Sequence, residues 1–125
     1  MTVLIDSWAW IEYFRGSKEG KSVSATIDSD DELIVSSINI GEVYYTSLKK
    51  IGRNSAIKQI EAIQARCRVI DINTDVIIRS AEIKYERKWG FADAIILATA
   101  ELENAVILTG DPHFKGLHRV RYLGK

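Results

Sequence analysis

The stretch from Phe91 to Asp111 constrains the fold of this chain more than any other part of the sequence. Its first half, residues 92–100, is apolar apart from Asp93 and Thr99, and its second half contains an uninterrupted apolar run, residues 106–108, that leads into Thr-Gly-Asp. An apolar run without alternation is typical of a strand that is covered on both faces of a parallel sheet. Asp93 begins a helix face that continues at i+3, i+4 and i+7 with Ile96, Leu97 and Ala100. We expect this face to be buried, and we expect Asp111 to lie at the sheet edge where open α/β folds bind ligands.

Each of these two acids also has a purely local explanation. Asp93 could cap its own helix, and Asp111 could cap the turn that follows it, with Pro112 in the favoured first helical position. Either acid alone leaves capping and chemistry equally open. Further acids at equivalent places in the chain would favour chemistry.

Strand-like and helix-like segments alternate along the whole chain. The expected strands are residues 3–5, 33–36, 69–72, 106–109 and an edge strand at 119–123, and the expected helices lie near 7–16, 38–51, 56–63, 78–85 and 92–100. This alternation predicts an α/β fold, a three-layer α/β/α sandwich around a mostly parallel twisted sheet. With 125 residues, we expect a single domain over residues 1–125.

Three further expectations concern individual segments. Ile78, Ala81 and Tyr85 have the spacing of a buried helix stripe, as have Ile40, Val43, Tyr44, Ser47 and Ile51 in the helix at 38–51. The aromatic residues of the first helix, Trp8, Trp10, Tyr13 and Phe14, are expected to pack in the core. Residues 16–22 resemble a phosphate-binding P-loop, but only three residues separate the glycines and the segment follows a helix, so we expect a solvated turn.

Composition excludes several classes of protein and of site. Lys plus Arg and Asp plus Glu both total 17, so net charge argues neither for nor against nucleic acid. The sequence has no apolar run near the roughly 18 residues that span a bilayer and no signal-peptide pattern, so we expect a soluble, cytoplasmic protein. Cys67 is the only cysteine, and His113 and His118 are the only histidines. This excludes a zinc site of the usual Cys/His type, and we expect any metal to be held by oxygen atoms.

Acids occur at equivalent places in four strand and helix units. Asp6 ends the first strand, Glu42 lies near the start of the helix after the second strand, Asp93 begins a buried helix, and Asp111 follows the fourth strand. We expect them to converge on one edge of the sheet. Two carboxylates about 5 Å apart at an effective dielectric of about 20 repel by roughly 3 kcal/mol, and a domain has only about 5–15 kcal/mol of net stability. A divalent cation relieves this repulsion directly.

Oxygen ligands point to Mg²⁺ or Mn²⁺ as that cation. Such a site suits phosphodiester hydrolysis, because it lowers the pKa of water and stabilises charge on a phosphoryl group. No serine, cysteine or histidine arrangement offers a rival nucleophile.

Four segments of the chain resemble the signature blocks of the PIN-domain ribonucleases. These are Ile5-Asp6-Ser7 with Trp10-Ile11, residues 37–42, residues 92–100, and Leu108-Thr109-Gly110-Asp111 with Phe114. The length and spacing are similar to those of the toxin branch, the VapC type, of toxin–antitoxin systems. The resemblance covers essentially all 125 residues.

The resemblance implies that Asp6, Glu42, Asp93 and Asp111 hold one or two Mg²⁺ or Mn²⁺ ions, with support from the hydroxyls of Ser7 and Thr109. It implies hydrolysis of RNA that leaves 5′-phosphate and 3′-hydroxyl ends. It also implies a homodimer and inhibition by a small antitoxin whose C-terminal arm enters the acidic groove. The chain departs from the pattern at Pro112-His113, where many relatives carry a further acid or amide, and at Asn39, where serine or threonine is common.

Cations and aromatic rings near the acids are candidates for RNA contacts. Tyr45, Lys49, Lys50 and Arg53 follow Glu42 on its helix, and Arg87, Lys88 and Trp89 precede Asp93. Solvated helix ends would explain either group equally well.

Three other functions share part of this pattern. A receiver-type signalling domain also gathers acids above a parallel sheet, but it needs two adjacent acids after the first strand and an aspartate after the third. This chain has only Asp6 at the first place, and Asp71 is expected inside its strand. The presence of all four acids argues against a catalytically idle PIN-like binding module, although it does not prove turnover. A stand-alone PIN nuclease in RNA processing or decay would share every residue above.

Overall fold

The computed structural model describes the whole chain, residues 1–125, and contains one five-stranded sheet. Its elements are β1 (Thr2–Ile5), α1 (Ser7–Arg15), α2 (Lys18–Ile27), β2 (Glu32–Ser36), α3 (Ser37–Ile51), α4 (Arg53–Arg66), β3 (Arg68–Ile70), α5 (Thr74–Arg87), α6 (Phe91–Leu102), β4 (Val106–Thr109), the short 3₁₀ helix η1 (Pro112–Phe114) and β5 (Val120–Tyr122). The predicted alternation of strands and helices is confirmed. No helix in the structure combines the length and the apolar character that a membrane crossing needs.

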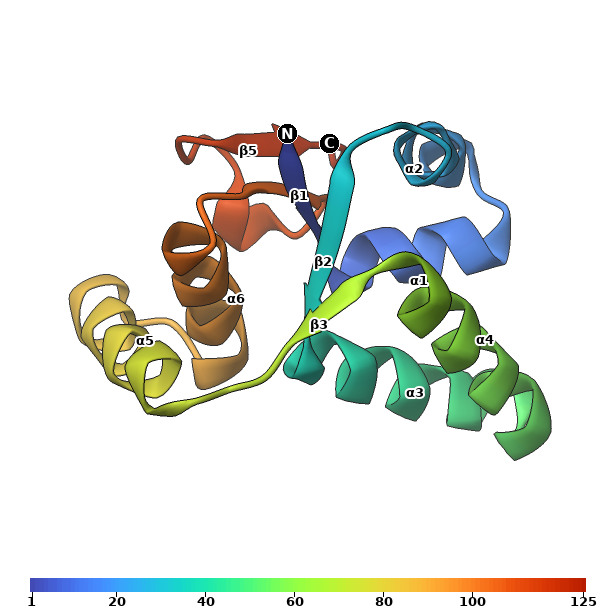
Figure 1. Ribbon diagram of the computed structural model, residues 1–125, viewed down its shortest axis with the longest axis horizontal. Helices are drawn as coiled ribbons and strands as arrows, with labels where there is room; N and C mark the ends of the chain where they lie inside the picture. Colours follow the sequence, from blue (N-terminus) through green and yellow to red (C-terminus); the bar gives the residue numbers. More distant parts are fainter.

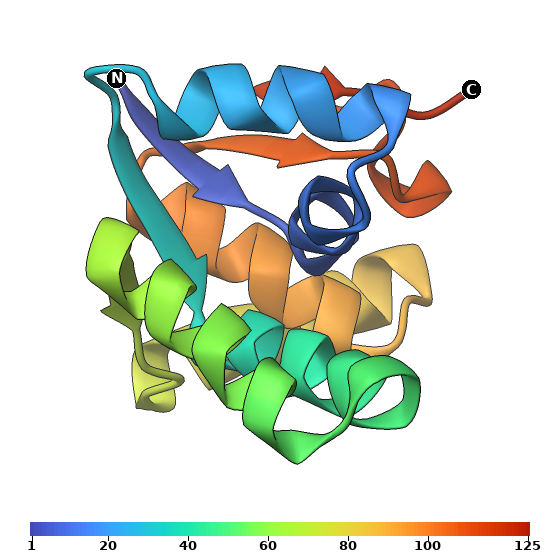
Figure 2. The ribbon, with the colours of Figure 1, turned by 90° about the vertical axis from the view of Figure 1, so that its right-hand side faces the viewer.

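The sheet has the strand order β3-β2-β1-β4-β5, and all four neighbouring pairs are parallel. The chain starts in the middle of the sheet, builds toward β3, and then returns to add β4 and β5 on the other side of β1. The order of the strands therefore reverses between β1 and β4, which is the switch point where open α/β sheets bind ligands. Figure 2 shows the twist of the sheet in the changing directions of β4, β1 and β2.

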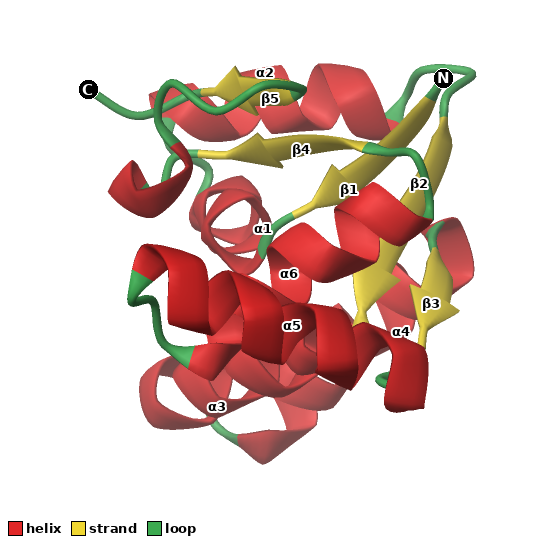
Figure 3. Cartoon of the chain, turned by 90° about the vertical axis from the view of Figure 1, so that its left-hand side faces the viewer, coloured by secondary structure: helices red, strands yellow, loops and turns green.

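Helices cover both faces of the sheet, as the sandwich prediction requires. Val3 and Ile5 belong to the core under α1 to α4, whereas Leu4, which points to the opposite face, belongs to the core under α5 and α6. Figure 1 shows α5 and α6 on one side of the sheet and α1, α2 and α4 on the other, and Figure 3 shows α5 as the outer helix over α6. The three-layer α/β/α architecture is confirmed.

Helix α6 is the most enclosed helix of the fold. All residues from Ala94 to Ala100 are buried, not only the predicted face. The additional burial arises because α6 lies between the sheet and α5, so each of its sides meets another apolar surface. Asp93, in the first turn, is thereby held on a helix that has little freedom to move.

The aromatic residues of α1 pack as expected, with Trp10 the most deeply buried. Only 2% of Trp10 is exposed, and its ring stacks on Phe14 and meets Tyr13 edge to face, each with centroids 5.8 Å apart. Such aromatic pairs contribute about 0.5–1.5 kcal/mol beyond their buried area. Trp10 also belongs to the same buried core as Val3 and Ile5 of β1, which holds α1 and the turn that carries Asp6 against the sheet.

The predicted buried stripe of α5 is wrong. The buried residues are Val76, Ser80 and Ile83, whereas Ile78 is 58% and Tyr85 87% exposed. Ser80 can face the core because its hydroxyl donates to the carbonyl oxygen of Val76 at 2.6 Å, so the hydroxyl is not left unpaired. An apolar stripe of α5 thus faces outward.

The segment at residues 16–22 is not a solvated turn. Ser17 begins α2 by accepting the backbone N–H of Gly20 at 3.1 Å. A Cβ atom on Gly20 would lie 2.5 Å from the backbone oxygen of Glu12, so the glycine allows α1 and α2 to pack closely.

Two smaller expectations also differ from the structure. β3 ends at Ile70, so Asp71 lies beyond the strand and not within it. Ile51, expected in the core stripe of α3, is 47% exposed because it is the last residue of that helix, next to Gly52. Val43 and Ser47 of the same stripe are buried.

Candidate active site

The acidic cluster, here defined as Asp6, Glu42, Asp93 and Asp111, lies at the switch point between β1 and β4. Asp6 directly follows β1, and Asp111 follows β4 after Gly110. Glu42 comes from α3 and Asp93 from the first turn of α6, two helices that contact each other. Burial is the main cause of a raised pKa at both Asp6 and Asp93, and the charges of Glu42 and Asp111 raise both values further. The structure therefore brings the four predicted acids together.

Asp6 is the buried member of the cluster, with 3% of the residue exposed. The hydroxyl of Thr109 donates to its Oδ2 at 2.6 Å, and Nδ2 of Asn39 donates to its Oδ1 at 3.2 Å. Burial raises the pKa of Asp6 from 3.8 to about 7, although the hydrogen bond from Thr109 acts in the opposite direction. Both carboxylate oxygens are thus held in place, and burial disfavours the ionised form.

Asn39 and Ser7 connect Asp6 to Glu42. Nδ2 of Asn39 also donates to Oγ of Ser7 at 2.9 Å, and the hydroxyl of Ser7 donates to Oε1 of Glu42 at 2.6 Å. The amide oxygen of Asn39 accepts the backbone N–H of Ser36 at 2.9 Å, as part of the capping box that begins α3. Sequence reasoning noted Asn39 only as a departure from a pattern. Its place three residues after Ser36, which caps α3, was the signal in the sequence that could have predicted its part in the capping box.

Thr109 links Asp6 to the second half of the cluster. Its Oγ1 accepts the backbone N–H of Asp111 at 3.0 Å while its hydroxyl hydrogen is donated to Asp6. The residue between them, Gly110, packs against the indole of Trp8, and a Cβ atom there would lie 2.4 Å from the ring. Only glycine lets this turn and Trp8 approach so closely.

Asp93, Asp111 and His113 form the more open half of the site. The capping explanation holds for Asp111, whose Oδ1 accepts the backbone N–H of His113 at 2.9 Å, but not for Asp93, since the capping position of α6 is Gly90. Nδ1 of His113 lies 2.8 Å from Oδ2 of Asp93 and 2.9 Å from Oδ1 of Asp111. The imidazole therefore bridges two acids of the cluster.

The charges of this half depend on one another. Burial raises the pKa of Asp93 to about 6, the charge of Asp111 adds to the increase, and the charge of His113 opposes it. The hydrogen bond with Asp111 is the main cause of a raised pKa at His113, and the charges of Asp93 and Asp111 add to it.

A nitrogen atom also lies among the oxygen atoms that we expected to hold any metal. Asp93, Asp111 and His113 each offer one ligand atom, and these atoms all lie within 4.8 Å of one another. The sequence did not indicate His113 as a possible ligand, because two histidines and one cysteine are too few for a Cys/His zinc site. The Asp-Pro-His order, which is typical of a tight capped turn, was the signal that brings the side chains of residues 111 and 113 together.

These residues fit a divalent cation. Two acids at the switch point, Asp6 and Asp93, have pKa values raised toward neutrality by burial and by neighbouring carboxylates. A cation among them would balance that charge, and carboxylate oxygens are ligands that Mg²⁺ and Mn²⁺ prefer.

The residues expected to contact RNA lie mostly on the surface. Tyr45 is 62% exposed, and Nζ of Lys49 lies 4.5 Å above its ring. Lys50 is exposed on the same helix, but Arg53, which was predicted to lie on it, begins α4 instead, because α3 ends before Gly52. Arg87 and Lys88 are also exposed. Trp89 is different, because it is half-buried and its ring meets those of His113 and Phe114.

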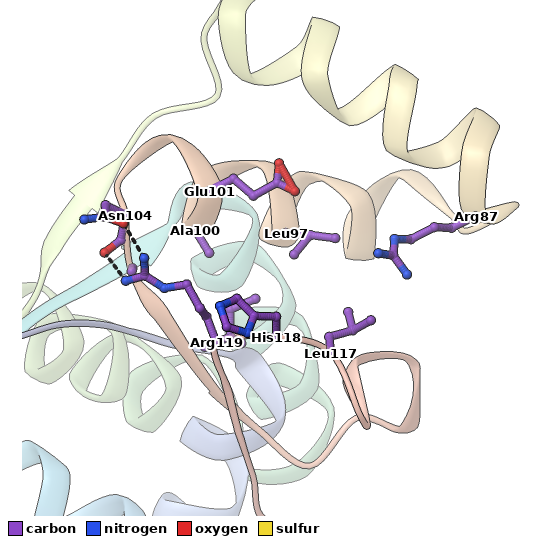
Figure 4. A pocket seen from close by; sticks show the side chains of 10 residues that line it. Arg87, Leu97, Ala100, Glu101, Asn104, Leu117, His118 and Arg119 are labelled. Atoms are coloured by element: carbon purple, nitrogen blue, oxygen red, sulfur yellow. Dashed lines mark hydrogen bonds between the residues drawn. The ribbon is translucent and has the colours of Figure 1, made fainter.

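A separate cavity of about 310 Å³ lies between α5, α6 and the segment before β5 (Figure 4). Leu97, Ala100 and Ile107 contribute apolar lining, and none of the four acids reaches it. His118 and Arg119 line it from the other side, and Arg119 donates to the side chain of Asn104 and, at 2.8 Å, to its carbonyl oxygen. The cavity is therefore distinct from the acidic cluster.

Solved structures of other proteins have the same fold as this chain. A chain of a toxin–antitoxin complex from Klebsiella pneumoniae is similar to this protein over 98% of both chains, with a TM-score of 0.82 and 26% identity. VapBC2 from Rickettsia felis, bound to a promoter DNA fragment, contains a chain with a TM-score of 0.78 and 17% identity over 98% of both chains. VapC20 of Mycobacterium tuberculosis, described as a toxin that cleaves the sarcin-ricin loop, gives a TM-score of 0.73 and 20% identity over 95% of this chain and 98% of its own.

A search of curated protein sequences gives no match. The family model described as the PIN domain, in contrast, matches residues 3–120, which is nearly the whole chain. The matched region includes all four members of the acidic cluster and both strands that form the switch point. The chain therefore belongs to the PIN domain family.

Proposed function

We propose that this protein is a Mg²⁺- or Mn²⁺-dependent endoribonuclease, and the toxin of a toxin–antitoxin pair. The observation that carries the proposal is the convergence of Asp6, Glu42, Asp93 and Asp111 at the switch point of the sheet. Membership of the PIN domain family, a family of nucleases, supports it.

The four acids would hold the cation, with His113 beside Asp93 and Asp111. When bound, the cation lowers the pKa of a water molecule and stabilises negative charge on the phosphoryl oxygens during hydrolysis. The chain's own residues fix the carboxylates. Thr109 and Asn39 orient Asp6, and Ser7 orients Glu42, so these acids need little rearrangement when charge develops. The expected products carry 5′-phosphate and 3′-hydroxyl ends.

We propose that RNA approaches along the exposed face of α3. Tyr45 and Lys49 lie on the same face as Glu42, three and seven residues farther along. Lys50 and Arg53 extend the positive charge, so this surface offers both a stacking ring and phosphate contacts. Arg87, Lys88 and Trp89 form a second surface for RNA beside Asp93.

Two protein partners are also part of the proposal. The similarity to chains in toxin–antitoxin complexes supports a small cognate antitoxin, whose C-terminal arm would enter the acidic groove. A homodimer is supported by the outward apolar stripe of α5, where Ile78 and Tyr85 are exposed. Such a toxin would act in the cytoplasm, where its RNA substrate is.

Cleavage of total cellular RNA by the purified, partner-free chain tests the function. Mg²⁺ and Mn²⁺ should each support cleavage, while EDTA and the Asp6→Asn variant should abolish it, and mapped 5′ ends would identify the target. Metal binding without cleavage would instead support an idle binding module. If the chain cleaves RNA but no neighbouring gene encodes a small DNA-binding protein, the result would support a stand-alone nuclease.

A further inference from the structure

His113 occupies an unusual place in the site, between two acids rather than beside one. Its Nδ1 lies 2.8 Å from Oδ2 of Asp93 and 2.9 Å from Oδ1 of Asp111, two residues that come from different elements. The side chain is 56% exposed, so the contact is not forced by burial. The ring is directed into the gap between the carboxylates.

The core of the protein sets the position of this ring. Trp89 meets the imidazole edge to face, with centroids 5.9 Å apart, and meets Phe114 at 5.3 Å. Phe114 is fully buried in the core under α5 and α6. His113 is also fixed through its backbone N–H, which Asp111 accepts. The imidazole is therefore positioned by packing and by the turn, and not only by its contact with the acids.

The spacing of the three polar atoms matches neighbouring ligands of one cation. Ligands at about 2.1 Å from an octahedral ion and about 90° apart are separated by roughly 3.0 Å. The two distances from Nδ1, 2.8 and 2.9 Å, are close to this value. Ligand atoms from Asp93, Asp111 and His113 all lie within 4.8 Å of one another, which leaves room for a shared ion.

We propose that Nδ1 of His113 is a ligand of the catalytic cation, together with Asp93 and Asp111. This inference rests on the proposed function for the presence of the cation and adds a nitrogen atom to its ligands. An imidazole ligand raises affinity for Mn²⁺ more than for Mg²⁺, because Mg²⁺ prefers oxygen donors. His113 thus biases the site toward Mn²⁺.

In the alternative arrangement, the side chain of His113 contacts the two acids only while no cation is bound, and it rotates away when the cation binds. A side chain that is 56% exposed on a three-residue turn has room to rotate away. In that case the cation would have oxygen ligands only. The two arrangements differ in whether a nitrogen atom contacts the bound metal.

Pulsed EPR of Mn²⁺ bound to the purified wild-type chain measures this contact directly. The sequence contains only two histidines, and His118 lines the separate cavity, so His118→Ala is a matched control for His113→Ala. We expect a strong imidazole-nitrogen coupling to Mn²⁺ in the wild type and in His118→Ala, and its loss in His113→Ala. Calorimetric titration should show Mn²⁺ affinity reduced about 10-fold in His113→Ala and Mg²⁺ affinity reduced less than about 3-fold.

The wild-type spectrum gives a result that does not depend on the folding of any variant. Mn²⁺ binding without nitrogen coupling overturns the role of His113 and leaves the proposed function intact. Coupling that persists in His113→Ala also overturns it. Failure of Mn²⁺ and Mg²⁺ to bind the wild type at all overturns both the ligand role and the metal-dependent function.

Discussion

The two halves of the acidic cluster are built in different ways. The half around Asp6 is buried and hydrogen-bonded, with Thr109, Asn39 and Ser7 linking it to Glu42. The half around Asp93 and Asp111 is partly exposed, and its acids are bridged by the side chain of one exposed residue, His113. The first half is fixed by the fold before any ligand binds. The second is open to solvent, so a cation and a substrate could reach it directly.

The two halves therefore differ in how burial affects the charge of their acids and in how their geometry is held. Burial makes the charge of Asp6 unfavourable in the folded protein, but its hydrogen bonds set the direction of both oxygens. Asp111 and His113 are less buried, so water can reach them, and their geometry depends on a short turn. A buried, hydrogen-bonded acid next to more exposed ones would let the proposed site bind a cation without rebuilding the fold.

The largest expected effect is that of Asp6→Asn on cleavage. We expect the rate of RNA cleavage to fall at least about 1,000-fold, because metal stabilisation of the transition state is worth several kcal/mol. The same variant should unfold at an equal or higher temperature at pH 8, because it removes a buried charge. Cleavage assays and thermal unfolding of one preparation check both statements. A variant that loses activity because it unfolds would contradict the view of Asp6 as a buried, unbalanced charge.

The next effect concerns pH and stability. The pKa of Asp6 is raised from 3.8 to about 7 in the folded protein, so the folded state binds this proton more tightly than the unfolded state does. The stability from this proton is fully present below about pH 3.8 and is lost as pH rises through about 7. In EDTA, the free energy of unfolding should fall by up to about 4 kcal/mol over that range.

Chemical denaturation at pH 5 and pH 8 measures this dependence. Asp6→Asn should remove the part that Asp6 contributes and leave the part from Asp93, whose pKa is also raised, whereas Asp30→Asn, at an exposed loop residue, should leave the dependence unchanged. Mn²⁺ should stabilise the wild type more at pH 8 than at pH 5, since it competes with protons for the carboxylates. Equal stabilisation at both pH values would argue against a cation at these acids.

A third variant, Gly110→Ala, tests the connection between the two halves. The added Cβ would lie 2.4 Å from Trp8, so the turn that carries Asp111 has to shift. We expect a loss of about 1–3 kcal/mol of stability, as for other overpacked sites, and a clear loss of cleavage. Trp8→Leu in the same chain should recover part of both. No recovery in the double variant would mean that contact with Trp8 is not the cause.

The smallest expected effect is on RNA binding through α3. Lys49→Ala combined with Lys50→Ala should weaken binding by a few-fold and reduce the dependence of affinity on salt, because two phosphate contacts are lost. Filter binding or fluorescence anisotropy between about 50 and 200 mM salt checks this. The exposed pair Lys18→Ala and Lys21→Ala on α2 is a matched control. Unchanged affinity at low salt would exclude this face as the RNA surface.

The sequence predicted the architecture and the convergence of the acids because both depend on local patterns. Uninterrupted apolar strands and helix spacing indicate a covered parallel sheet, and the position of Asp6 or Asp111 after a strand indicates the sheet edge. The phase of α5 could not be predicted in this way, because Ser80 becomes an acceptable core residue only through its hydrogen bond to Val76. A pattern based on apolar residues alone leaves serine out of the buried face, so it placed the wrong side of α5 in the core.

The missed site residues depend on contacts between distant parts of the chain. Asn39 acquires its role from Asp6, 33 residues earlier, while its own sequence context indicates only a helix cap. His113 meets Asp93 because α6 and η1 come together in three dimensions. The steric need for Gly110 is set by Trp8 on α1. Residue type and spacing along the chain do not reveal which distant residues come into contact in the fold.

Anomalous diffraction from crystals grown with Mn²⁺ tests most directly whether the acidic cluster is a cation site. The account predicts a peak within about 2.0–2.6 Å of a carboxylate oxygen of Asp6 and of an oxygen of Asp93 or Asp111. Replacing Asp6 with Asn should weaken or remove the peak. A peak located only elsewhere on the protein, or no peak although the crystals contain Mn²⁺, would contradict it.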